Sequence, residues 1–207
     1  MNDKYKTAMI SYENYFKAYT EKKDAYLSYS DYYGWGSNSI KSSIAILYTD
    51  LIHFGIDKTK NTIAREIAEN YLHYIHGANP LNLVYLSNMK QYGAENSVSQ
   101  FYHTWFTNGS SLWDQVGVST YGPPPGFLTG GPNKDYKWDF SACPANPICN
   151  SETIPQNEPP MKFYRDINTS WPLNSWEITE NSCTYQINYI NLLSNYVSLA
   201  PELGVKK

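Results

Sequence analysis

The stretch Trp171-Pro-Leu-Asn-Ser-Trp176-Glu177-Ile-Thr-Glu180-Asn-Ser-Cys183-Thr-Tyr185-Gln186 organises the C-terminal part of this chain. Two tryptophans and two glutamates fall within ten positions, and an apolar pattern with the period of a helix follows them. We therefore expect a helix from about Glu180 to Leu199. Its expected buried face consists of Cys183, Ile187, Ile190, Leu193 and Val197.

Both glutamates are expected at or just before the start of this helix, and either one suits acid chemistry. Aromatic rings exclude water from a nearby carboxylic acid and so favour the protonated form that a general acid needs. Trp171, Trp176 and Tyr185 are close enough in sequence to do this. However, acidic residues are common in first turns simply because they complement the helix dipole. The residues alone favour Glu180 over Glu177 only slightly.

The composition indicates a globular protein with unusually many rings that carry a polar edge. The 207 residues are 42% hydrophobic, which is enough for one domain or for part of a larger one. The net charge of −3 offers no basic surface for nucleic acid and no polybasic membrane patch. No apolar run approaches the roughly 18 residues needed to cross a bilayer. The 20 Tyr and 6 Trp suit either a cleft that stacks on sugars or a Tyr-rich core.

Three more helices are expected in the N-terminal third of the chain, at residues 4–20, 39–54 and 58–76. Gly55 is the expected stop of the second helix, and Asp57 is the expected N-cap of the third. The expected buried stripes are Ile40, Ile44, Leu47 and Leu51 on the second helix, and Ile63, Ile67, Tyr71 and Ile75 on the third.

From Pro80 to Asn174 glycine and proline crowd the sequence, and only residues 83–87 and 116–121 have an extended pattern. A loop region this long is improbable in a compact domain unless it builds a functional surface. Helices that alternate with long aromatic loops predict an all-α barrel or toroid with a cleft at one end. A four-helix bundle is disfavoured because its connections are short.

The cysteines and histidines leave alternatives open. Cys143 and Cys149 lie in one Pro/Asn-rich loop and could form a disulfide or help to hold a metal, whereas Cys183 is expected to be buried. His103 lies in a polar loop bordered by rings, where its imidazole could contact a substrate hydroxyl or simply pack. The residues do not separate these two interpretations. The first residues of the chain lack the apolar segment of a signal peptide.

Four motifs, in order along nearly the whole chain, resemble the C-terminal half of family 9 glycoside hydrolases, which are endoglucanases and cellobiohydrolases. Tyr33-Gly-Trp35-Gly-Ser-Asn resembles the segment before a barrel helix in that family. Tyr74-Ile-His-Gly77-Ala-Asn79-Pro80 resembles a helix end, and Pro125-Gly-Phe-Leu-Thr-Gly130-Gly-Pro-Asn133 resembles a loop. Thr179-Glu180-x-x-x-x-Tyr185-Gln resembles the motif whose glutamate is the general acid.

The resemblance implies part of an (α/α)6 barrel, with residues 1–207 as the C-terminal portion of the catalytic domain. It implies an inverting hydrolysis of β-1,4-glucosidic bonds in cellulose or related β-glucans, with Glu180 rather than Glu177 as the acid. It also implies secretion, and calcium is the one metal that it leaves open. The implied substrate contacts are Trp35, as a stacking platform, His103, Trp105, Tyr121 and Tyr185.

The sequence departs from this family at two places. Thr104 and Trp105 follow His103 where many members have His-Arg, so the arginine contact to substrate is missing. The Asp-Ala-Gly-Asp motif, whose aspartates activate the water, does not occur in the sequence. We therefore expect an isolated chain to be inactive and to need an N-terminal half of the barrel as a partner. The alternative is a carbohydrate-binding protein without turnover.

Overall fold

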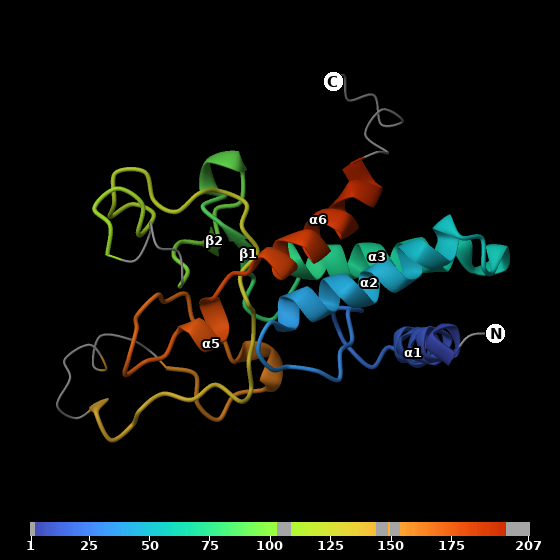
Figure 1. Cartoon of the computed structure of the whole chain (residues 1–207), viewed down its shortest axis with the longest axis horizontal. Helices are drawn as coiled ribbons and strands as arrows, with labels where there is room; N and C mark the ends of the chain where they lie inside the picture. The colour runs from blue at the N-terminus through green and yellow to red at the C-terminus, as the bar shows by residue number, and fades with distance from the viewer. Residues whose placement is uncertain (1–2, 103–108, 144–148, 150–153, 198–207) are drawn as a thin grey trace. The chain divides into compact units, whose positions relative to one another are not determined.

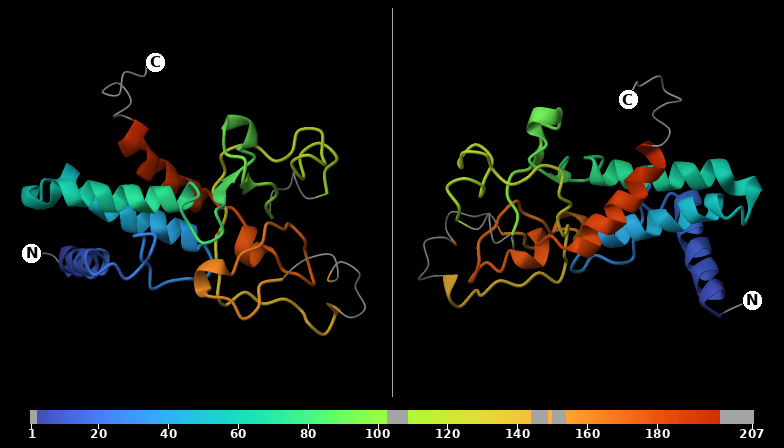
Figure 2. Two further views of the ribbon diagram at one scale, coloured as in Figure 1. Left: turned by 180° about the vertical axis from the view of Figure 1, so that it is seen from behind. Right: turned by 45° about the horizontal axis from the view of Figure 1, so that its top comes forward.

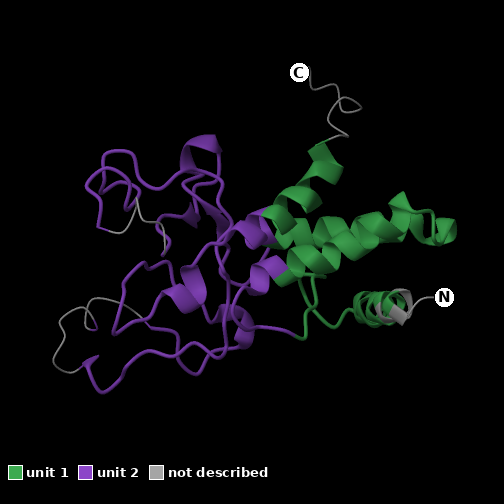
Figure 3. Cartoon of the chain, in the orientation of Figure 1, with its two compact units in different colours: residues 1–31, 40–74, 187–207 green, residues 32–39, 75–186 purple. Residues whose placement is uncertain are grey.

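The computed structural model of the chain describes residues 3–102, 109–143, 149 and 154–197. The described chain is rich in helix, and its strands are short (Figure 1). It divides into two compact units (Figure 3). Unit 1 comprises Met1–Asp31, Ile40–Tyr74 and Ile187–Lys207, and unit 2 comprises Tyr32–Ser39 and Ile75–Gln186.

Unit 1 is built mainly from four helices. They are α1 (Asp3–Thr20), α2 (Ser37–His53), α3 (Asn61–Ile75) and α6 (Cys183–Val197). Helices α2 and α3 run side by side, and α6 crosses them (Figures 1 and 2). The Asn188 amide of α6 donates to Ser43 Oγ of α2 at 3.0 Å, and the Tyr196 hydroxyl donates to the Arg65 carbonyl of α3 at 3.0 Å.

The core of unit 1 contains a buried cation among apolar and tyrosine side chains. Lys41 of α2 is 0% exposed, and its Nζ donates to the Ser28 carbonyl. The same Nζ lies 4.1 Å from the centre of the Tyr74 ring. Burial lowers the pKa of Lys41 to about 7, although the nearby charge of Asp24 acts in the opposite direction. A pattern of apolar residues could not have revealed this buried position, because Lys41 is itself a charged residue.

The three expected N-terminal helices are confirmed, with small changes at their ends. Gly55 ends α2 with a φ of +60°, as expected. Asp57 accepts from the Thr59 amide at 3.1 Å, but it caps a 3-10 turn, η1 (Lys58–Lys60), that leads into α3. The prediction that Ile40 is buried is wrong, because its side chain is 38% exposed.

The last helix differs more from its prediction. The chain forms a short α5 (Trp176–Thr179), then a break, and then α6 from Cys183 onward. The expected buried face is largely exposed: Ile187, Ile190 and Val197 are 64%, 60% and 59% exposed. Tyr189 and Leu192 are buried instead. Since α6 is apolar on two sides, the 3.6-residue period identified a helix but could not tell which side packs.

Unit 2 consists mostly of loops, with a small parallel sheet. Strands β1 (Val84–Ser87) and β2 (Ser97–Val98) pair in the register Val84 with Ser97 and Ser87 with Val98, with an irregularity between the two pairs. The extended segment expected at residues 83–87 is therefore confirmed, and an all-α fold is corrected to a helix-rich one. Residues 116–121, also expected to be extended, form turns because Ser119 and its neighbours bond back to residues 110–115. Unit 2 also contains the 3-10 turns η2 (Lys90–Tyr92) and η4 (Pro160–Lys162).

The cysteines resolve one of the open alternatives. Cys143 and Cys149 form a disulfide, so they are not metal ligands. Cys183 is exposed at the start of α6, which corrects the expectation that it is buried. In the part of the chain that the structure describes, no helix combines the length and apolarity needed to cross a membrane.

Candidate functional site around Glu180

Glu180 lies in the break between α5 and α6, in unit 2. Its backbone is extended, with φ −56° and ψ 141°, and its amide donates to the Trp176 carbonyl at 3.3 Å. It is therefore the last cap of α5 and not the first residue of a long helix. This corrects the expected helix start and removes the helix dipole as the explanation for an acid at this position.

The indole of Trp35 contacts the Glu180 carboxyl group directly. Trp35 Nε1 donates to Glu180 Oε2 at 2.9 Å, across 145 positions of sequence. The Trp35 ring is 45% exposed, and the Tyr32 hydroxyl donates to its backbone carbonyl at 3.1 Å. The hydrogen bond fixes the position of one carboxyl oxygen, so Glu180 and the predicted stacking ring of Trp35 are held next to each other.

Tyr185 completes this cluster from the first turns of α6. Burial raises the pKa of Tyr185 to about 12, with smaller contributions from the negative charge of Glu180 and from Tyr32. The Tyr185 hydroxyl lies against Gly36, where a Cβ atom would be 2.5 Å from it. Gly36 also has a φ of +77°, which side chains rarely adopt. The ring therefore stays a neutral hydrogen-bonding group beside Glu180 at ordinary pH.

Gly130 and Gly131 lie close to the backbone of the segment that carries Glu180. A Cβ on Gly130 would lie 3.0 Å from the Ile178 carbonyl and 3.2 Å from that of Glu180. Gly131 donates its amide to Ile178 at 2.9 Å, and the Gln186 amide bonds both backbone groups of Leu128 at 2.8 Å. Gln186 and Gly130 were not predicted as site residues, although both lie within motifs that resemble the family.

Glu177 has a different environment from Glu180. Its Oε2 accepts from the Lys137 amide at 2.9 Å, and its backbone carbonyl accepts from the Asn133 amide at 3.0 Å. These bonds attach the loop after Asn133 to α5. Glu177 is therefore occupied in holding a loop, which is a structural role.

The two tryptophans near Glu180 in sequence make other contacts. Trp171 Nε1 donates to Asp139 Oδ2 at 3.1 Å, and the Trp176 ring lies 5.4 Å from that of Tyr102. The ring in contact with Glu180 is instead Trp35, from the other end of the sequence. Closeness in sequence therefore did not identify the tryptophan that bonds Glu180.

Among the other predicted substrate contacts, Tyr121 lies within the described residues. Tyr121 is 61% exposed and lies over the Trp113 ring, with 4.7 Å between ring centres. Its backbone bonds Leu112 and Asn88. His103 and Trp105 lie outside the described residues.

Calcium takes six to eight oxygen ligands, often with several carboxylates. Among the described residues, no three His, Cys, Asp or Glu side chains gather in a group that could hold a metal ion.

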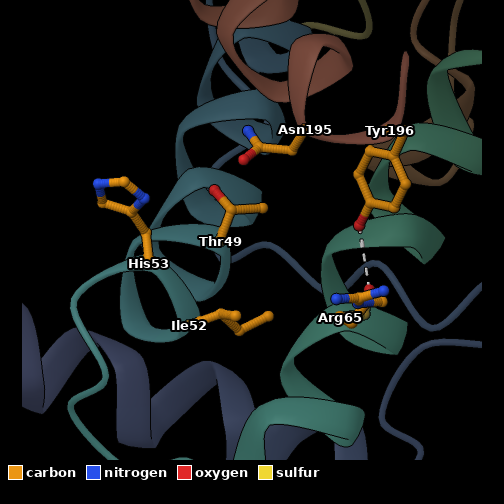
Figure 4. A pocket seen from close by; sticks show the side chains of 6 residues that line it. All are labelled: Thr49, Ile52, His53, Arg65, Asn195 and Tyr196. Carbon is orange, nitrogen blue, oxygen red and sulfur yellow. Dashed lines mark hydrogen bonds between the residues drawn. The ribbon is translucent and has the colours of Figure 1, made fainter. Parts of the chain in front are cut away.

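A pocket in unit 1 offers different chemistry (Figure 4). It has a volume of about 160 Å³ and is lined by Thr49, Ile52, His53, Arg65, Asn195 and Tyr196. None of these residues is a carboxylic acid, and glycoside hydrolysis uses a pair of them. Glu180 and its neighbours are therefore the better candidate for an active site.

Glu180 and Trp35 place a carboxylic acid, the group that glycoside hydrolases use, beside an exposed ring with a flat apolar face. The chain belongs to glycosyl hydrolase family 9, because the model of that family matches residues 1–188. It is 27% identical over 149 residues to a cellulose 1,4-beta-cellobiosidase of Acetivibrio thermocellus, which covers 72% of this chain and 14% of that protein.

Two solved structures have a similar fold. One is a single mutant of a thermostable endoglucanase from Alicyclobacillus acidocaldarius, with a TM-score of 0.53 and 20% identity over 79% of this chain and 25% of that one. The other is AaCel9A in complex with cellobiose-like isofagomine, with a TM-score of 0.55 and 19% identity over 80% and 26% of the two chains. This chain thus spans about a quarter or less of the length of these relatives.

Proposed function

We propose that this chain supplies the general-acid side of an inverting β-1,4-glucanase site, as part of an (α/α)6 barrel. Glu180 is the proposed proton donor to the glycosidic oxygen of cellulose or a related β-glucan. The observation that carries the proposal is the 2.9 Å hydrogen bond from Trp35 Nε1 to Glu180 Oε2, in a member of glycosyl hydrolase family 9.

The geometry suits this role because the indole occupies one carboxyl oxygen. In the proposed role, Oε2 accepts from Trp35 while Oε1 is the oxygen that delivers the proton to the glycosidic oxygen. The half-exposed Trp35 ring supplies a flat face for a glucosyl ring next to that proton. Tyr185, protonated at neutral pH, offers a hydroxyl to the substrate.

The mechanism also requires a second carboxylate that activates water on the opposite face of the sugar. This sequence lacks the Asp-Ala-Gly-Asp motif that would provide it. We propose that the general base comes from an N-terminal half of the barrel. Without the base, the hydrolysis rate would fall by a factor of about 10²–10⁴. His103, Trp105 and Tyr121 are proposed further contacts to the glucan, and an extracellular location follows from the family.

The test compares hydrolysis of carboxymethylcellulose and cello-oligosaccharides by the chain alone and with an Asp-bearing N-terminal half of the barrel. We expect activity only from the combination. Rapid hydrolysis by the chain alone would contradict the need for a partner.

The second candidate function is carbohydrate binding without turnover, favoured by the absent Asp motif and the exposed Trp35 ring. Calorimetry with cellotetraose, followed by analysis of the sugar afterwards, separates the two candidates. Binding to the combined halves with no product would support this candidate over the first.

A further inference from the structure

Unit 2 contains an open groove formed by residues that the proposed chemistry does not use. Its volume is about 460 Å³, which is in the range of roughly 300–1,000 Å³ that is usual for ligand sites. Rings and neutral polar groups dominate its lining, which includes Trp138, Phe140, Phe163, Lys137, Gln156 and Asn157. None of these residues contributes to the cluster around Glu180.

Phe140 in the groove is exposed, and Trp138 and Phe163 are partly exposed, although burial would stabilise the fold. Phe140 is 70% exposed, and the Trp138 ring meets it edge to face with 5.1 Å between ring centres. Burial of a phenylalanine side chain stabilises a fold, and this fold largely forgoes that gain at Phe140. Exposed apolar groups that gather in one place usually mark a binding surface.

The backbone beneath the rings is held from both sides. Lys137 donates its amide to Glu177 Oε2 at 2.9 Å, and its carbonyl accepts from the Asn174 amide at 3.0 Å. Asp139 donates its amide to the Pro172 carbonyl at 2.8 Å. A ring on a fixed backbone loses little freedom when a ligand binds, which favours affinity.

The Asp139 carboxylate accepts hydrogen bonds that hold neighbouring residues of the groove segment in place. It accepts from the Ser141 amide and hydroxyl and from Trp171 Nε1. These hydrogen bonds, with that of Ser141 the largest cause, lower the pKa of Asp139 below its usual value. The same bond holds the Trp171 ring, 59% exposed, beside the segment that carries Trp138 and Phe140.

We propose that this groove binds a short segment of a β-linked glucan chain, as a second carbohydrate site beside the one at Glu180. A β-glucosyl unit has apolar C–H faces, which rings can cover, and a rim of hydroxyl groups. Gln156, Asn157 and Lys137 provide donors, and the two amides also provide acceptors, for that rim. Lys137 is the one charged side chain among the residues that line the groove, and the neutral polar groups beside it suit an uncharged, hydroxyl-rich ligand. The choice of glucan as ligand rests on the proposed function.

The experiment measures calorimetric affinity for cellohexaose and retention on insoluble cellulose for Trp138→Ala and Phe140→Ala. Phe54→Ala is the matched control, because Phe54 is also 70% exposed but lies at the end of α2 in unit 1. A thermal melt confirms that each variant is folded. If a lost ring contact is worth about 0.5–1.5 kcal/mol, each groove variant weakens binding roughly twofold to tenfold.

Weaker binding of both groove variants, with Phe54→Ala unchanged and some binding left in Trp35→Ala, would support the second site. Groove variants that bind as the wild type does would overturn it, and so would a wild-type chain that binds no glucan. The proposed function is judged separately, by the effect of Glu180→Gln on hydrolysis. A groove that binds glucan in a protein without hydrolysis would leave the second site standing and remove the catalytic proposal.

Discussion

Replacing Gly36 by alanine tests how closely the segment before α2 is fitted to Tyr185. The added Cβ would lie 2.5 Å from the Tyr185 hydroxyl oxygen and 2.8 Å from Cζ, so the ring must move. The residue also keeps a φ of +77°, which costs a non-glycine residue about 1–2 kcal/mol. We expect a total loss of about 2–5 kcal/mol, since overpacking typically adds about 1–3 kcal/mol.

The matched control is Gly117→Ala, because Gly117 has the same φ of +77° but no atom within 4 Å of its would-be Cβ. Both residues belong to unit 2. Urea denaturation, followed by tryptophan fluorescence, gives the free energy of unfolding of each variant. Gly117→Ala should lose only the backbone cost of about 1–2 kcal/mol. Equal losses in the two variants would refute the close fit between Gly36 and Tyr185.

Two further predictions concern the buried lysine and the cysteines. Lys41 has a pKa of about 7 in the folded chain and 10.5 when exposed. Between these pH values the unfolded chain binds more protons than the folded chain. The free energy of unfolding of the wild type should therefore increase as the pH rises from about 7 to 10.5. Lys41→Met should remove this gain in urea titrations at several pH values, and a variant that keeps the full pH dependence would contradict the assignment. Replacing Cys143 and Cys149 by alanine opens a loop with a separation of 6 residues and should cost about 2 kcal/mol in the same assay. In the folded wild type, a thiol reagent should label one cysteine, Cys183, and labelling of three would show that the disulfide is absent.

The helices were predictable because their signals are local. A period of three to four residues located α1, α2 and α3, and Asp57 capped the turn where its side chain was expected to do so. These features depend on neighbours within one or two turns, which the sequence displays directly. Which side of α6 is buried depends on contacts with parts of the chain that are distant in sequence. Ile187 and Ile190 are as apolar as Leu192, and only the fold decides which of them is buried.

The sequence could single out Glu180 as the candidate acid, but it said less about the residues around it. The resemblance to a known motif selected Glu180, and the structure places Glu177 in a different, loop-holding role. The contact between Trp35 and Glu180 joins residues 145 positions apart. No local pattern encodes such a pairing. The two tryptophans near Glu180 in sequence contact other residues, since Trp171 donates to Asp139 and the Trp176 ring lies against Tyr102.

The most direct test of the central claim compares two substrates in a complete barrel, formed by this chain and an Asp-bearing N-terminal half. Cellotetraose has a poor leaving group and needs a proton donor, whereas 2,4-dinitrophenyl β-cellobioside leaves without one. For Glu180→Gln we predict a loss of about 10²–10⁴ in kcat on cellotetraose and little loss on the dinitrophenyl substrate. Glu177→Gln should keep activity on both. Equal losses on the two substrates for Glu180→Gln, or full activity on cellotetraose, would contradict its role as the general acid.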